Sequence, residues 1–99
     1  MGEECLKVVV GSPWLDTVDQ EHIPLKVSNL CDEELSVELE ALTPQGGSLQ
    51  RFSLRLPGST TRELEVVTDL YLQGISIRGR WRKNGGEWRE MEEIYVSLR

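Results

Sequence analysis

Basic side chains gather in one stretch near the end of the chain. Arg78, Arg80 and Arg82 recur at every second position, and Arg89 follows beyond the turn signal Asn84-Gly85. In an extended strand, a spacing of two puts all three arginines on the same face. Because the planar guanidinium fork suits bidentate contact with oxyanions, this arginine stripe could bind a phosphate, a polyanion or an acidic partner.

The same stripe could instead be neutralised from within the chain. Glu38 and Glu40 alternate in the same way on an earlier segment, and Glu93 follows the basic stretch. If the two segments are neighbouring strands, with Glu93 on the other side, opposite charges face each other and contribute about 0.2 to 1 kcal/mol per pair. We expect this internal pairing to explain the stripe, and we keep ligand binding as the alternative.

Two tryptophans, Trp81 and Trp88, flank the Asn84-Gly85 turn signal. In a two-residue hairpin they pair directly, and an aromatic pair contributes about 0.5 to 1.5 kcal/mol beyond its buried area. Tryptophan and arginine are also the residues enriched in binding hot spots. The sequence therefore predicts a partner-binding hairpin with the candidate residues Arg78, Arg80, Trp81, Arg82, Trp88 and Arg89. We expect Trp14, which lies in a loop, to cap the core instead.

Few other residues could do chemistry. One histidine, His22, and two cysteines are too few for a structural zinc site, and their spacing does not suggest a Cys-His nucleophile. The acidic run near the C-terminus lies along an extended segment, so we expect a solvated strand face rather than a calcium loop; it comprises Glu87, Glu90, Glu92 and Glu93. We therefore predict no catalytic residue, no metal and no cofactor.

The two cysteines leave two readings open. Cys5 stands just before one predicted strand and Cys31 just after the next, so an antiparallel register could bring them within disulfide distance. Unpaired cysteine is also among the most buried residue types and fills small apolar niches in reducing compartments. We expect two free thiols, with the disulfide as the alternative.

Alternation of apolar and polar residues dominates the chain, and turn residues break it into seven short segments. This pattern predicts an all-β fold, an antiparallel sandwich of about seven strands. Pro24 indicates a sheet edge or a bulge, because proline gives the ladder no N–H. The apolar link 69–73 is expected to cross from one sheet to the other. The predicted strands are 6–10, 21–30, 34–42, 48–56, 60–68, 74–83 and 87–98.

Two stretches have a layout that is found in a known superfamily. The first, from Ile23 to Leu39, combines a strand, an Asn-containing turn and an acidic strand; the second joins Leu56-Pro57-Gly58-Ser59-Thr60 to Gly74-Ile75-Ser76-Ile77. They resemble small immunoglobulin-like domains such as fibronectin type III and CARDB-like adhesion modules. The resemblance implies one immunoglobulin-like sandwich over residues 1–99. The Cys-Trp-Cys core of antibody domains is missing, so no antibody-type function is implied.

Composition narrows the classes of partner. The 99 residues include 17 Asp and Glu against 11 Lys and Arg, a formal net charge of −6. We expect no nucleic-acid partner, which would need a basic surface, and no membrane span, which would need about 20 apolar residues. The acidic start lacks the pattern of a secretory signal and, with free thiols, favours the cytoplasm.

The sequence as a whole predicts a non-catalytic structural or protein-binding module. Such a module would be a small subunit or a domain of a longer protein, and it would dock another protein or a neighbouring domain through the hairpin and the adjacent sheet face. One alternative is a carbohydrate- or polyanion-binding module, and another is an enzyme-associated or protease-inhibitor domain. A homodimer formed by edge or face pairing also stays open.

Overall fold

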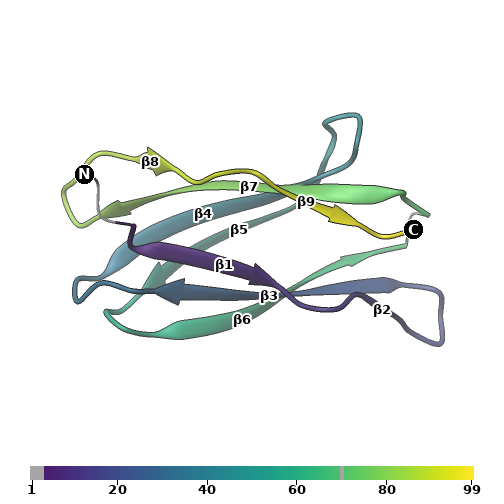
Figure 1. Cartoon of the computed structure of the whole chain (residues 1–99), viewed down its shortest axis with the longest axis horizontal. Helices are drawn as coiled ribbons and strands as arrows, with labels where there is room; N and C mark the ends of the chain where they lie inside the picture. Colours follow the sequence, from purple (N-terminus) through teal and green to yellow (C-terminus); the bar gives the residue numbers. More distant parts are fainter. Residues whose placement is uncertain (1–3, 70) are drawn as a thin grey trace.

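The alternating segments form nine β-strands and no helix in the computed structural model, which describes residues 4–69 and 71–99. Two antiparallel sheets lie face to face as two layers (Figure 1). Within the described ranges, no helix could cross a membrane. The all-β class and the antiparallel pairing predicted from the sequence are therefore confirmed.

Sheet A has β3 (Glu21–Asn29) at its centre. One side of β3 pairs with β1 (Leu6–Val10) and then with β2 (Trp14–Leu15), and the other side pairs with β6 (Thr61–Thr68). Sheet B has the order β5 (Ser48–Leu56), β4 (Leu35–Leu42) and β7 (Gly74–Lys83), and β7 also pairs with β8 (Arg89–Glu90) and β9 (Ile94–Ser97).

The strand count differs from the predicted seven at two places. The expected strand 87–98 is interrupted at residues 91–93 and becomes β8 and β9, and the expected loop after β1 contains β2. The link 69–73 connects β6 of sheet A to β7 of sheet B, as expected, although Leu70 within it lies outside the described residues.

Pro24 lies in a central strand, so the expected edge position is wrong. It pairs with Glu65 of β6, and its carbonyl accepts a hydrogen bond from the N–H of Gly11 at 2.8 Å on the other side. Gly11 lies between β1 and β2, where the regular ladder along this side of β3 is interrupted. Pro24 therefore lies opposite the gap between β1 and β2, where the missing N–H of the proline interrupts no strand pairing.

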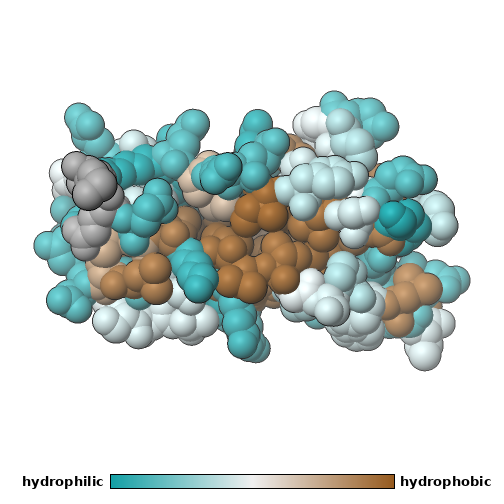
Figure 2. All heavy atoms as spheres, in the orientation of Figure 1, coloured by the Kyte–Doolittle hydropathy of each residue, from teal (hydrophilic) through white to brown (hydrophobic). Residues whose placement is uncertain are grey.

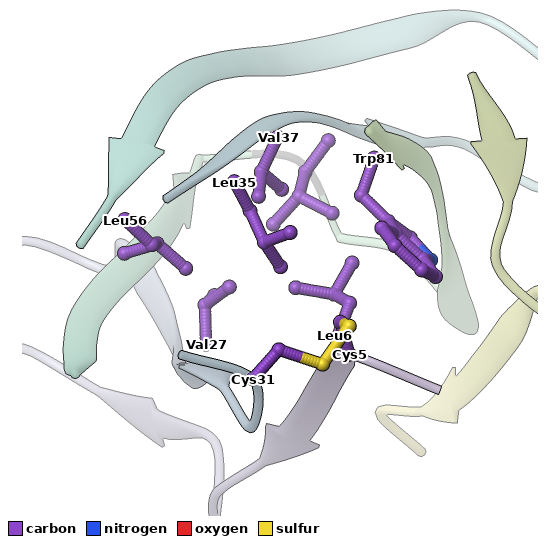
Figure 3. Packing of buried hydrophobic residues seen from close by; sticks show 9 residues of the cluster. Cys5, Leu6, Val27, Cys31, Leu35, Val37, Leu56 and Trp81 are labelled. Carbon is purple, nitrogen blue, oxygen red and sulfur yellow. A yellow bond between two sulfur atoms is a disulfide. The ribbon is translucent and has the colours of Figure 1, made fainter. Parts of the chain in front are cut away.

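The core fills the space between the sheets, and its side chains alternate with outward-facing ones along every long strand. β4 points Leu35, Val37, Leu39 and Ala41 inward, as predicted. Figure 3 shows one of two core clusters, in which the Trp81 side chain points from β7 toward Leu6 and the cysteines. Hydrophobic side chains also form a band between the layers on the side where β1 and β9 lie (Figure 2).

Cys5 and Cys31 form a disulfide with a Cα–Cα distance of 5.2 Å, so the expectation of free thiols is wrong. The register of β1 on β3 pairs Leu6 with Asn29 and places Cys5 beside the turn that follows β3. The N–H of Cys31 donates to the Asn29 side-chain oxygen at 2.9 Å, which turns Cys31 back toward β1. The weak argument from free thiols for a cytoplasmic location is thereby removed.

Candidate functional site

The predicted hairpin between β7 and β8 forms, but its register is shifted by one residue. Trp81 pairs with Arg89 rather than with Trp88. The turn is closed by the N–H of Gly86 donating to the Lys83 carbonyl at 2.8 Å, and of its residues only Gly85 has a positive φ, +74°. A two-residue type I′ turn needs positive φ at both central positions, so the loop is longer than predicted.

This shift places the two tryptophans on opposite faces, because a slip of one residue inverts the side of every side chain. Trp81 is 3% exposed and belongs to the core. It is therefore unavailable to a partner, and its assignment as an interface anchor is wrong. Arg89 is exposed and its guanidinium lies 5.6 Å from the centre of the Trp81 ring, at the edge of the core.

Trp88 lies on the outer face of sheet B, together with the arginine stripe. The guanidiniums of Arg80 and Arg82 lie 4.3 and 4.6 Å from the centre of its ring. Each cation–π contact contributes about 0.5 to 1 kcal/mol at an exposed site. The hairpin therefore carries on this face a half-buried tryptophan with two guanidiniums over its ring.

The internal pairing expected for the arginine stripe is confirmed in two of its three rows. The register of β4 on β7 pairs Glu40 with Arg78 and Glu38 with Arg80. Arg78 Nη2 donates to Glu40 Oε1 at 2.9 Å, and Arg80 Nε donates to Glu38 Oε1 at 2.8 Å. Arg82, the third arginine, pairs in register with Ser36, which has no charge.

Glu40 receives a second arginine from β5. Arg51 Nε donates to Glu40 Oε2 at 2.8 Å. Hydrogen bonds from Ser48, Arg51 and Arg78 lower the pKa of Glu40 from 4.5 to about 2. Glu40 is therefore ionised at any physiological pH, and one carboxylate binds two guanidiniums.

Glu93 does not take the place expected for it. In the part of the chain that the structure describes, it forms no ion pair with the stripe, and Glu90 of β8 is the residue in register with Arg80. The cause is the irregular stretch 91–93, which interrupts the ladder along β7. An open hollow of about 710 Å³ runs beside these rows and is lined by the paired charges Glu38, Glu40, Arg51, Arg78 and Arg80.

A second cluster of titratable groups, missed by sequence reasoning, lies on the outer face of sheet A. His22 Nε2 contacts Asp16 Oδ2 at 2.7 Å, and His22 Nδ1 contacts Glu65 Oε1 at 2.7 Å. A neutral imidazole has only one N–H, so donation to two carboxylates requires the imidazolium form. The hydrogen bond to Asp16 and then that to Glu65 raise the pKa of His22.

Trp14 belongs to this cluster, so its predicted role as a cap of the core is wrong. Its ring stacks on the His22 ring at 3.9 Å with an interplanar angle of 11°, and it is 49% exposed. Asp16 also accepts the N–H groups of Val18 and Gln20 at 2.9 Å each. The cluster thus fixes the turn between β2 and β3. Trp14 and His22 lie close in the sequence on either side of a turn, so their contact had a local signal. Glu65, on the distant β6, had none.

Another ion pair ties the last residue to sheet A. Arg99 donates from both terminal nitrogens to the buried Glu21 carboxylate at 3.0 Å, and its guanidinium lies 3.9 Å from the centre of the Tyr71 ring. The hydrogen bond to Glu21 raises the pKa of Arg99 further. The pairing holds the chain end against β3.

Comparison with known proteins finds a similar fold and gives no information on activity. No protein-family model and no curated protein matches the sequence. A crystal structure of Northeast Structural Genomics Consortium target SoR45 is similar, with a TM-score of 0.54, 10% identity, and coverage of 98% of this chain and 89% of that chain. At this identity the likeness concerns the fold alone. Among the described residues, no group of three or more His, Cys, Asp or Glu side chains is arranged to hold a metal ion.

Proposed function

We propose that this chain is a non-catalytic protein-binding module of immunoglobulin-like architecture. Its docking surface is the outer face of sheet B with the β7–β8 hairpin, and we call this surface the B face. The immunoglobulin-like assignment is supported by two antiparallel sheets within about 100 residues and by connections that pass between the sheets at β3–β4, β5–β6 and β6–β7. The fold alone does not determine a function.

The observation that carries the proposal is Trp88 with its two guanidiniums. Tryptophan and arginine are the residues most enriched among binding hot spots, and ordered side chains lose less entropy on binding. Arg80 and Arg82 are held over the Trp88 ring before any partner arrives. A sugar that stacked on this ring would compete with these guanidiniums, so the arrangement favours a protein over a carbohydrate.

The proposal is tested by comparing three immobilised proteins exposed to a lysate of cells that express the chain. They are the wild type, a B-face variant (Trp88→Ala) and a sheet A control (Lys26→Ser with Glu63→Ser). The control removes an exposed ion pair of 4.0 Å on the opposite face. All three must show the same circular dichroism spectrum.

We expect a protein that the wild type and the control retain and that the B-face variant loses. The same protein, once purified, should bind the B-face variant at least about tenfold more weakly, which corresponds to the loss of about 1.4 kcal/mol. Equal binding to all three proteins would show that the B face is not the docking surface.

A further inference from the structure

Three consecutive rows cross the B face, and each row takes one residue from β5, β4 and β7. The row through Glu40 is Arg51, Glu40 and Arg78; the row through Glu38 is Ser53, Glu38 and Arg80; the row through Ser36 is Arg55, Ser36 and Arg82. Successive rows are two residues apart along each strand, so all nine side chains share one face.

The Glu40 row shows what this geometry can bind. Its two arginines stand on the strands on either side of β4, and both donate to the single carboxylate between them, at 2.8 Å from Arg51 and 2.9 Å from Arg78. Neighbouring strands are about 4.8 Å apart, so the two arginine backbones are roughly 10 Å apart and their side chains converge over β4. The carboxylate fits this space without distortion of the ladder.

The Ser36 row repeats the arrangement without the carboxylate. Arg55 and Arg82 occupy the positions that Arg51 and Arg78 occupy two rows away, and the residue between them is a serine. Among residues 4–69 and 71–99, no carboxylate lies within ion-pair distance of Arg55 or Arg82. Arg82 is oriented by Trp88, and the Arg55 side chain is exposed.

We propose that the Arg55–Ser36–Arg82 row is a carboxylate receptor. It takes the Asp or Glu side chain of a protein partner into the position over β4 that the Glu40 carboxylate fills in its own row. The hydroxyl of Ser36 supplies a further hydrogen-bond donor in this row. This inference rests on the proposed function, because the row is part of the B face and adjoins Trp88. It names the partner's chemistry as an acidic segment.

A carboxylate suits the row better than a phosphate group. The occupied row two positions away holds a carboxylate between equivalent arginines, and charge-assisted hydrogen bonds from guanidinium to carboxylate are among the strongest in proteins.

The test uses an acetylated, amidated peptide of alternating Gly and Glu as the source of carboxylate, with inorganic phosphate as a second arm. Both are titrated into isotope-labelled protein and followed by NMR at low ionic strength, because screening weakens exposed pairs. We expect the peptide to shift the amide signals around Ser36, Arg55 and Arg82. Tighter binding of inorganic phosphate than of the peptide would overturn the assignment to carboxylate.

A matched pair of double variants separates the receptor from general attraction to positive charge. Arg55→Gln with Arg82→Gln removes two positive charges from the Ser36 row and breaks no ion pair of the described residues. Arg51→Gln with Arg78→Gln removes two positive charges from the Glu40 row. We expect the first to weaken peptide binding by about tenfold, the equivalent of one charge-assisted hydrogen bond, and the second by less than about threefold. Equal weakening by both would overturn the proposal.

Ser36→Glu provides a second test that keeps both arginines. The new carboxylate should occupy the row from within, preserve the fold and abolish peptide binding, whereas Ser36→Thr, which keeps a short hydroxyl side chain, should not. Peptide binding by Ser36→Glu at the wild-type level would contradict the receptor. If Ser36→Glu retains the cellular partner and Trp88→Ala loses it, the receptor is rejected and the docking face stands. If both retain it, the docking face itself is rejected.

Discussion

The outer faces of the two sheets hold their charges in different ways. On sheet A, one imidazolium is enclosed by two carboxylates and a tryptophan ring, and its side chain is 14% exposed. On sheet B, arginines repeat in rows, and the carboxylates of the described residues fill two rows and leave the third empty. The charge of His22 is already paired with two carboxylates of the same chain, so it stabilises the fold. The Ser36 row has two arginines and no carboxylate between them, so these arginines can bind a carboxylate from a partner.

The largest expected effect is on stability, and it tests whether Trp81 lies in the core while Trp88 lies on the outer face. Trp81→Ala should lower the free energy of unfolding by about 3 to 5 kcal/mol, because it empties a buried indole site. Trp88→Ala removes an outer side chain and two cation–π contacts, and should cost no more than about 2 kcal/mol. Urea unfolding followed by far-UV circular dichroism measures both. Similar losses for the two variants would mean that the hairpin register is wrong.

The disulfide provides a test of whether the two faces are independent. It joins two positions 26 apart in the sequence, one at the edge of sheet A and one in the turn that leads into sheet B. Replacing both cysteines by alanine should lower the free energy of unfolding by about 3 to 4 kcal/mol. Since neither cysteine touches the B face, the affinity for the Gly-Glu peptide should stay the same under folding conditions. A parallel loss of affinity would show that the B face depends on this link.

The pH dependence of the His22 cluster tests the sheet A side of the comparison. Because the fold raises the pKa of His22 above 6.5, its contribution to stability is complete below pH 6.5 and is lost as the pH rises through the higher folded value. The fold lowers the pKa of Asp16 below 3.8, chiefly through the His22 hydrogen bond. That contribution is complete above pH 3.8 and is lost as the pH falls through the lower folded value.

The chain has one histidine, so NMR of its ring reports the His22 pKa without ambiguity. We expect a pKa above 6.5 that falls in both Asp16→Asn and Glu65→Gln. The Trp14 indole signal should shift with the same midpoint, because its ring stacks on the imidazolium. A value at or below 6.5 would contradict an imidazolium held by two carboxylates.

The smallest effect is a gain of binding. Glu40→Ser removes the carboxylate between Arg51 and Arg78, copies the Ser36 row and so creates a second empty row. If empty rows are what bind carboxylates, this variant should bind the Gly-Glu peptide about twofold more tightly, since two sites replace one. The shifted signals should extend to the residues around position 40. Unchanged affinity with shifts confined to the Ser36 row would mean that an empty row alone is not sufficient.

The parts of the fold predicted from the sequence depend on local patterns. Alternation on β4 and the turn residues around each strand predict the two-sheet class, and once β4 and β7 are taken as neighbours, the pairing of Glu38 and Glu40 with the arginines follows. The pairing of charges across a ladder is a regular consequence of strand geometry, so it could be anticipated without coordinates.

The errors arise where one residue or one distant contact decides the outcome. A single extra turn residue moves Trp81 from an exposed pair into the core, and Asn84-Gly85 alone does not specify loop length. The contact of His22 with Glu65 spans 43 positions and has no local signal. The disulfide depends on the conformation of the turn after Asn29, and the hydrogen bond from the Cys31 N–H to the Asn29 side chain determines this conformation.

Hydrogen exchange at the arginine Nε–H groups tests the central claim most directly. Arg51, Arg78 and Arg80 each donate their Nε–H to a glutamate, and no such bond is formed by Arg55 or Arg82 within the described residues. Side-chain NMR should therefore show slower Nε–H exchange for the first three, and only Arg55 and Arg82 should slow when the Gly-Glu peptide is added. Equal exchange at all five arginines, or slowing on peptide addition at Arg78 and Arg80 instead, would contradict an empty carboxylate receptor in the Ser36 row.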